Sequence, residues 1–289
     1  MEKLGDDELG LIFNRVHDPD DRKSFSQIIH SQPHLLHNFL RRFPNLVRFK
    51  ASGPIGKTHL ELISQTRTKL QVLNLNTPTM DYANFNDICS INDGICAIAN
   101  GCPGLTQVYL RRRVIRNAGL LHLITDHALQ AIGSATSLRV LNLQGCFFIS
   151  DSGLKMLAKG SVSRTLKKLH GGVVPCLEEL NLACCGSVTD VSVVALGAIQ
   201  TLKKLNLSCL NVSDVTLVAI AQHCWNLGVL DLSNCELITG EGVLAFAEHE
   251  CLQVLVVSRS QALKCIRLNV WMPMEMRENL GRFCRLDWS

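Results

Sequence analysis

The sequence predicts an α/β solenoid, a curved horseshoe with a parallel β-sheet on its concave face and helices outside. Two observations carry this prediction. The pattern Leu-x-x-Leu-x-Leu recurs along the chain, and its copies begin 25 residues apart at Leu177, Leu202, Leu227 and Leu252. Each copy is followed by a helical pattern of apolar residues, so one unit holds one strand and one helix. Such a unit cannot bury its apolar face alone, but stacked units can.

The unit that begins at Leu138 shows what each position contributes. Leucines and polar residues alternate along its strand, which is the period of a strand with one buried face. Cys146 then follows in a turn, where its apolar side chain is expected to pack into the core, and Ser150 can cap the next helix. Residues 153–158 place their apolar side chains on one face of that helix. The same order recurs in the later units and, less regularly, in the units upstream.

The whole pattern resembles the cysteine-containing class of leucine-rich repeats. In that class, a Cys three residues past the strand is followed by I/V-[ST]-D and by a Leu-rich helix that ends near a second Cys. Two units depart from this pattern, because Arg113 and Leu210 stand where the turn Cys is expected. The resemblance covers residues 46–257 and implies a leucine-rich-repeat solenoid of about eight units, with insertions in its front half.

The 13 cysteines include no pair of C-x-x-C motifs, which argues against a zinc ribbon or finger. The repeat pattern assigns six of them to packing positions: Cys102, Cys146, Cys185, Cys224, Cys235 and Cys251. Metal or redox chemistry is the alternative, and it rests on the adjacent pair Cys184-Cys185 and on Cys89, Cys96 and Cys102, which are near in sequence. Packing is favoured because a buried free Cys behaves as a small hydrophobe. We therefore expect no metal and no cofactor.

The net charge of +4 is mild and gives no strong argument for binding nucleic acid. The first residues are acidic and lack the apolar region of a secretory signal. No run of 18 apolar residues occurs, so no membrane span is expected. These features predict a protein of the cytoplasm, the nucleus or both, in which the cysteines are thiols.

Residues 1–27 do not fit the repeat. Positions 9, 12, 13 and 16 are apolar and follow acidic residues, which predicts an amphipathic helix. The segment resembles the first half of an F-box, which begins L-P-x-E-L-L-x-x-I-F and continues after a turn with D-R-x-x-x-S. Gly5 stands where that family usually has Pro, and the V-C-x-x-W segment of the family does not follow Gln27. The resemblance implies that a Skp-type adaptor of a cullin complex is bound through Leu4, Glu8, Leu9, Ile12 and Phe13.

The alternative for this segment is a helix that only covers the first repeat of the solenoid. The predicted organisation is a partial F-box-like helical segment at 1–27, a linker and capping helix at 28–45, the repeats at 46–257, and a C-terminal cap or tail at 258–289. A partner-docking surface is the alternative for the last segment, because Trp and Met suit adaptable interfaces.

On a horseshoe, the outward strand positions line the concave face, where repeat proteins usually hold partners. These positions give one predicted substrate-binding set: Asn74, Gln107, Tyr109, Arg111, Asn142, Gln144, Glu179, Asn181, Lys204, Asn206 and Asp231. Tyr109 with Arg111 is the best single candidate, because Tyr and Arg dominate binding hot spots. Taken singly, each of these residues is also explained as a solvated polar position of a sheet.

No catalytic motif occurs, because the sequence has no G-x-S-x-G, no P-loop and no G-x-G-x-x-G. We therefore expect a protein that is not an enzyme. The F-box resemblance implies the substrate-recognition subunit of a Skp–cullin–F-box E3 ubiquitin ligase, whose repeats hold an unidentified target protein for proteasomal degradation. One alternative is a stand-alone leucine-rich-repeat scaffold. Another is an inhibitor of the ribonuclease-inhibitor kind, although that kind uses longer alternating repeats than the 25-residue steps of this chain.

Overall fold

The structure is a computed structural model, and it describes residues 36, 37, 40, 45–50, 55–66, 68–75, 91–111, 125–160 and 177–258. The predicted N-terminal segment 1–27 lies outside the described residues, and so do its predicted adaptor contacts Leu4, Glu8, Leu9, Ile12 and Phe13. The insertion expected around residues 161–174 and the segment from residue 259 onward also lie outside them. The described residues belong mainly to the predicted repeats.

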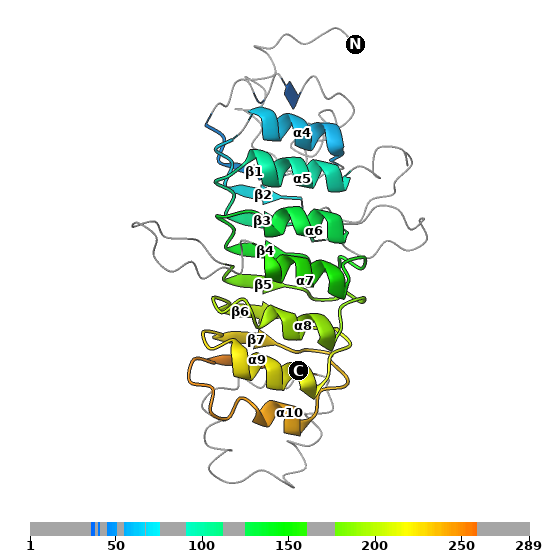
Figure 1. Cartoon of the computed structure of the whole chain (residues 1–289), viewed down its shortest axis with the longest axis vertical. Helices are drawn as coiled ribbons and strands as arrows, with labels where there is room; N and C mark the ends of the chain where they lie inside the picture. Colours follow the sequence, from blue (N-terminus) through cyan, green and yellow to red (C-terminus); the bar gives the residue numbers. More distant parts are fainter. Residues whose placement is uncertain are drawn as a thin grey trace, which may run out of the picture.

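Eight short strands form one parallel sheet, in which the order of the strands is their order in the chain. Each strand pairs in register with the next, so that Leu141 lies opposite Leu180 and Leu180 lies opposite Leu205. The strands are β1 (Arg48–Lys50), β2 (Val72–Asn74), β3 (Gln107–Tyr109), β4 (Val140–Asn142), β5 (Glu179–Asn181), β6 (Lys204–Asn206), β7 (Val229–Asp231) and β8 (Val254–Val256). This arrangement confirms the predicted leucine-rich-repeat solenoid (Figure 1).

In the described ranges, one helix stands between every two successive strands. The helices are α4 (Lys57–Thr66), α5 (Ile91–Gly101), α6 (Asp126–Gly133), α7 (Asp151–Lys159), α8 (Asp190–Leu196), α9 (Asp214–His223) and α10 (Gly240–Leu244). Each helix contacts the next, so the helices form a second layer beside the sheet (Figure 1). None of the helices in the described part of the chain has the length and hydropathy of a membrane-spanning segment.

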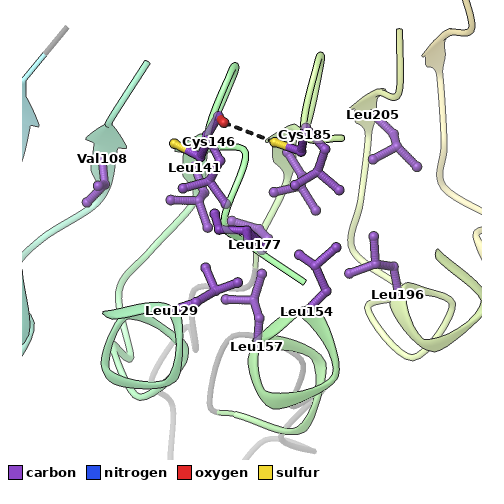
Figure 2. Close-up of a cluster of buried hydrophobic side chains, with 14 of the residues drawn as sticks. Val108, Leu129, Leu141, Cys146, Leu154, Leu157, Leu177, Cys185, Leu196 and Leu205 are labelled. Atoms are coloured by element: carbon purple, nitrogen blue, oxygen red, sulfur yellow. Dashed lines mark hydrogen bonds between the residues drawn. The ribbon is translucent and has the colours of Figure 1, made fainter. Parts of the chain in front are cut away.

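A continuous core of aliphatic side chains fills the space between the two layers. Figure 2 shows Leu141 and Leu205 on the strands, pointing toward Leu129 and Leu154 on the helices. All four side chains are at most 1% exposed. Burial of a single Leu side chain contributes roughly 1.5–3 kcal/mol to stability. The repeated leucines therefore supply the core, as their alternation with polar residues predicted.

A Ser or Thr caps four of the helices, as the repeat pattern predicted. The side-chain oxygens of Ser150, Thr189, Ser213 and Thr239 each accept a hydrogen bond from the backbone N–H two residues further on. These bonds satisfy backbone donors that the first turn of a helix leaves without an intrahelical acceptor. The start of each of these four helices is therefore fixed by its own cap.

An aspartate at the start of a helix joins that helix to the next repeat. Asp190 Oδ1 accepts a hydrogen bond from the Ser213 backbone N–H at 2.8 Å, and Asp190 Oδ2 accepts one from the Ser213 hydroxyl at 2.7 Å. The same pair of bonds links Asp126 to Ser150, Asp151 to Thr189, and Asp214 to Thr239. We call these four carboxylates the Asp ladder. The sequence predicted only a cap by the residue before the helix, such as Ser150, so the contact between repeats is a finding of the structure.

The turn cysteines fill the core and also connect neighbouring repeats. The Sγ atom of Cys185 donates a hydrogen bond to the Leu143 carbonyl at 3.2 Å (Figure 2). Equivalent bonds of 3.3 Å and 3.2 Å run from Cys146 to Leu110 and from Cys235 to Leu207. The predicted packing role is confirmed for these three cysteines and for two others that are also buried, Cys102 and Cys224.

The packing role predicted for Cys251 is wrong, because this side chain is exposed. The helix before it, α10, has five residues, whereas α9 has ten and is followed directly by the buried Cys224. After the shorter helix, the chain reaches the next strand through a run of turns. That path buries Leu252 and leaves Cys251 on the solvent side.

Candidate partner-binding surface

The eleven predicted contact residues lie on the strands or two residues after them. In-register pairing brings the third residues of the strands into one row, which includes Tyr109, Asn142, Asn181, Asn206 and Asp231. The first residues form a second row, which includes Gln107, Val140, Glu179 and Lys204. Both rows point away from the helices, because the residue between them on each strand points into the core. We call these two rows, together with Arg111 and Gln144, the open face.

The Asn and Asp residues of the open face hold the turns that follow the strands. Asn142, Asn181, Asn206 and Asp231 each accept, through a side-chain oxygen, a hydrogen bond from the backbone N–H two residues further on, at 2.9–3.1 Å. The Asn206 amide also donates to Asp231 Oδ2 at 3.0 Å. An Asn or Asp side chain that bonds its own backbone in this way forms an Asx-turn. Four predicted contact residues therefore have a structural role, whatever partner the face binds.

Opposite charges on strands β5 and β6 are paired with each other. Lys204 Nζ lies 2.7 Å from Glu179 Oε1, and this hydrogen bond raises the pKa of Lys204. Directly before these strands, Glu178 lies between Arg139 at 2.6 Å and Lys203 at 3.3 Å. Burial alone would raise the pKa of Glu178, but hydrogen bonds from the two cations more than offset it and keep the pKa low. On β5 and β6, the two charged side chains of the open face are therefore paired with each other.

Two large side chains of the open face, Tyr109 and Arg111, stand on and directly after β3. The Tyr109 hydroxyl donates a hydrogen bond to Gln107 Oε1 at 3.3 Å, and Tyr109 is half-buried. Arg111 is exposed two residues beyond this strand. The corresponding position after β4 holds Gln144, and those after β5, β6 and β7 hold Ala183, Ser208 and Ser233, which are much smaller. The structure thus places Tyr109 and Arg111 on the same face, and their role as a hot spot stays a prediction.

Four turns at the rim of the open face each end in a residue whose backbone has the left-handed conformation. Gly145, Cys184, Cys209 and Asn234 have φ angles of 73°, 58°, 60° and 58°. Gly and Asn adopt this conformation readily, whereas other side chains adopt it at a steric cost. The backbone N–H of each residue donates to a carbonyl of the next repeat at 2.7–2.9 Å, which continues the sheet. In the sequence, only Gly145 and Asn234 indicate this row, because Gly and Asn adopt the left-handed conformation readily whereas Cys does not.

The described ranges contain no group of three or more His, Cys, Asp or Glu side chains that could hold a metal ion. A Cys and a His do meet on α5 and α6, where Cys96 Sγ lies 3.8 Å from His127 Nδ1. Burial and the charge of Asp93 raise the pKa of the Cys96 thiol. A thiol with a raised pKa holds its proton at neutral pH, so this contact does not activate Cys96 as a nucleophile.

A comparison with family models agrees with this repeat assignment. The model described as "Leucine Rich repeat" matches residues 134–158, 175–197 and 223–247. Each range contains one strand and ends in, or just after, the helix that follows it. The repeats read from the sequence and those seen in the structure therefore have the same register, and the chain is a leucine-rich-repeat protein in its fold.

Two curated relatives are similar to this chain: "Coronatine-insensitive protein homolog 2" of Oryza sativa subsp. indica and the protein of the same name from subsp. japonica. Each is 27% identical over 207 residues, which cover 68% of this chain and 32% of the relative. The chain thus spans about a third of the length of these relatives. Among solved structures, the complex of Rad7 and Elc1 in yeast contains a chain that matches with 17% identity, 89% coverage of both chains and a TM-score of 0.32. A score that low supports no comparison of function.

Proposed function

We propose that this chain recognises a partner protein through the open face. The observation that carries the proposal is the sheet itself, in which eight parallel strands present two long rows of mostly polar, half-exposed side chains. Stacked repeats create an extended surface of this kind, and repeat proteins use it to hold partners. Tyr109 and Arg111 would anchor the partner, because large Tyr and Arg side chains contribute most to hot spots.

We further propose that the partner is a substrate of a Skp–cullin–F-box E3 ubiquitin ligase. The support is the resemblance of residues 4–26 to the first half of an F-box, followed by leucine-rich repeats in the same chain. In this role Leu4, Glu8, Leu9, Ile12 and Phe13 contact the Skp-type adaptor, and the repeats select the protein for ubiquitination. The chemistry would belong to other subunits. Such a receptor would act in the cytoplasm, the nucleus or both.

A stand-alone interaction scaffold is the second candidate. One observation favours it, namely that the V-C-x-x-W segment expected in the second half of an F-box does not follow Gln27. In this case the N-terminal segment would only cover the first repeat, as the ends of a solenoid require. The open face would still bind a protein, but no ubiquitin transfer would follow.

Co-purification with a Skp-type adaptor separates the two candidates. The full chain, carrying an affinity tag, should retain the adaptor through a wash in moderate salt. The double substitution Leu9→Asp, Ile12→Asp should abolish this retention, because it places charge on the predicted apolar side of the N-terminal helix. Asn14→Asp adds a charge on the opposite side and is the matched control, so this variant should still retain the adaptor.

The ligase proposal fails if the adaptor is retained neither by the full chain nor by a version in which a complete F-box has been restored. It also fails if the double substitution and Asn14→Asp retain the adaptor equally. Either result leaves the scaffold as the better description of the chain.

A further inference from the structure

Two cysteines of neighbouring repeats lie together outside the core. Cys184 and Cys209 occupy the same turn position after strands β5 and β6. Both are free thiols, with Cys184 half-buried and Cys209 exposed. Packing explains the adjacent Cys185, which is fully buried, but it does not explain these two. Backbone conformation does not explain them either, because Cys adopts the left-handed conformation at a steric cost. The equivalent turns contain Gly145 and Asn234, which adopt it readily.

The backbone holds the two cysteines in register. The Cys184 N–H donates to the Ser208 carbonyl at 2.9 Å, and the Cys209 N–H donates to the Ser233 carbonyl at 2.8 Å. Parallel segments that are hydrogen-bonded in this way lie about 4.8 Å apart. Disulfides span Cα separations of roughly 4.4–6.8 Å, so this spacing falls inside the permitted range.

The two thiols are close enough to influence each other. Burial, a hydrogen bond with Cys209 and the charge of Cys209 raise the pKa of Cys184, while the positive charge of Arg111 acts in the opposite direction. The two thiols therefore interact across the boundary between two repeats. The charge of Arg111, which belongs to the open face, thus acts on Cys184 from two strands away.

We propose that Cys184 and Cys209 are a modification site, at which hydrogen peroxide converts the two thiols into a disulfide between repeats. Cys209 is the exposed thiol, so the peroxide reaches its sulfur first, and this sulfur attacks one oxygen of the peroxide while its proton passes to the other oxygen. The O–O bond breaks, the sulfur becomes a sulfenic acid, and the other oxygen leaves as water. The Cys184 sulfur then attacks Cys209 Sγ, and the sulfenic oxygen leaves as a second water with the Cys184 proton. Two thiols lose two electrons, and the peroxide gains them.

The geometry makes this disulfide easy to reverse. The two residues share nearly the same φ angle, so their Cα–Cβ bonds run almost parallel. Bonded cysteines have Cβ atoms about 3.8 Å apart, so the two side chains must approach by roughly 1 Å to form the bond. A bond formed under such strain is more readily reduced than a relaxed structural disulfide.

Peptide mapping of the folded full chain tests this proposal. The chain is treated with hydrogen peroxide, its remaining thiols are alkylated, and it is then cut before aspartates, which leaves Cys209 as the only cysteine in peptide 190–213. We expect this peptide to be joined to peptide 151–189 through Cys184, with a mass lower by two hydrogen atoms than the sum of the two peptides. Dithiothreitol should separate them. A Cys209 that carries only oxygen, or that is joined to any other cysteine, would overturn the proposal.

Two substitutions complete the test. Cys209→Ser should remove the linked peptide, and Cys184→Ser should do the same if the first variant does not fold. Cys251→Ser is the matched control, because Cys251 is also exposed but lies in another part of the repeat. This control should form the link to the same extent as the native chain. Loss of the link in Cys251→Ser would contradict the assignment.

Discussion

At the scale of single residues, one carboxylate in each of four successive repeats joins that repeat to the next. Asp190 accepts hydrogen bonds from the Ser213 backbone N–H, the Ser213 hydroxyl and the Thr216 hydroxyl, at 2.8, 2.7 and 2.5 Å. Burial alone would raise the pKa of Asp190, but these bonds more than offset it, so the pKa lies below its usual value. Hydrogen bonds to an ionised acceptor are stronger than neutral ones. Asp190 therefore acts as a link between α8 and α9.

Replacing Asp190 should weaken the fold. Asp190→Ala should lower the free energy of unfolding by about 1–3 kcal/mol, because three donors lose their acceptor in a partly buried place. Asp93→Ala is the matched control, since Asp93 is an exposed carboxylate that pairs with Lys57, and the change should be smaller. Urea unfolding followed by circular dichroism measures both variants. Equal losses would show that the Asp ladder adds nothing beyond a surface charge.

A glycine at the end of α7 allows two repeats to approach closely. A Cβ atom added at Gly160 would collide with the backbone carbonyl of Gly133 in the preceding repeat. Replacing Gly by Ala often stabilises a protein by about 0.4–1 kcal/mol through the unfolded state. Gly160→Ala should instead destabilise this chain by about 1–3 kcal/mol, as overpacking does.

Thermal unfolding of Gly160→Ala and of a control variant at a second glycine tests whether the close contact causes the loss of stability. A Cβ atom at Gly104 would lie 3.9 Å from the Leu70 carbonyl, which is an ordinary contact. Gly104→Ala should therefore leave the midpoint of unfolding unchanged or raise it slightly. A Gly160→Ala variant that is as stable as Gly104→Ala would mean that the two repeats are not as close as the structure places them.

At the scale of elements, the Asp ladder aligns the starts of successive helices. It begins at Asp126 on α6 and ends at Asp214 on α9, because α10 begins with Gly240 in place of an Asp. Each carboxylate also lies in the first turn of its own helix, where the helix dipole favours negative charge. One residue per repeat thus orients its own helix and fixes the cap of the next.

The Asp ladder makes stability depend on pH in the acid range. The pKa values of Asp151 and Asp190 are lower in the fold than their usual values. Their contribution to stability is therefore fully present above the unfolded value of about 3.9 and is lost as the pH falls through the lower folded values. The free energy of unfolding, measured by urea titration between pH 6 and acid conditions, should fall less steeply with pH in an Asp151→Asn, Asp190→Asn variant. The same slope in both chains would contradict this linkage.

The elements could be predicted from sequence because their signals are local. Leu141 and Leu143 alternate with polar residues, and Ser150 stands directly before the helix that it caps. The Asp ladder could not be predicted, because Asp151 meets Thr189 only after the repeats stack, 38 residues further along the chain. Cys251 was misplaced for a related reason, since its burial depends on the length of the preceding helix.

On the candidate surface, too, the sequence predicts local features but not the contacts that form once the chain has folded. Alternation along a strand predicts which side chains point outward, and the structure places all eleven predicted residues on or beside the open face. Alternation does not predict what an outward side chain bonds to. Asn142 and Asn181 were predicted as contacts for a partner, and in the structure their oxygens hold the turns. The position of Cys184 beside Cys209 likewise depends on the register between repeats.

At the scale of the whole molecule, each repeat contributes to one continuous core and to one continuous surface. The surface is uneven along the solenoid. Large side chains stand on and after β3 at Tyr109 and Arg111, whereas smaller ones stand after β5 to β7. A partner that fills this surface would meet its main anchors in the front half and a flatter, hydrogen-bonding region behind it.

The central proposal is that the open face selects a protein for ubiquitin-dependent degradation. The most direct measurement compares protein abundance across cells that express the full native chain and cells that express the variant Tyr109→Ala, Arg111→Ala at the same level. We predict that at least one protein falls in abundance with the native chain, does not fall with the variant, and is restored when the proteasome is inhibited. The proposal is contradicted if no protein falls, or if the same proteins fall equally with both chains.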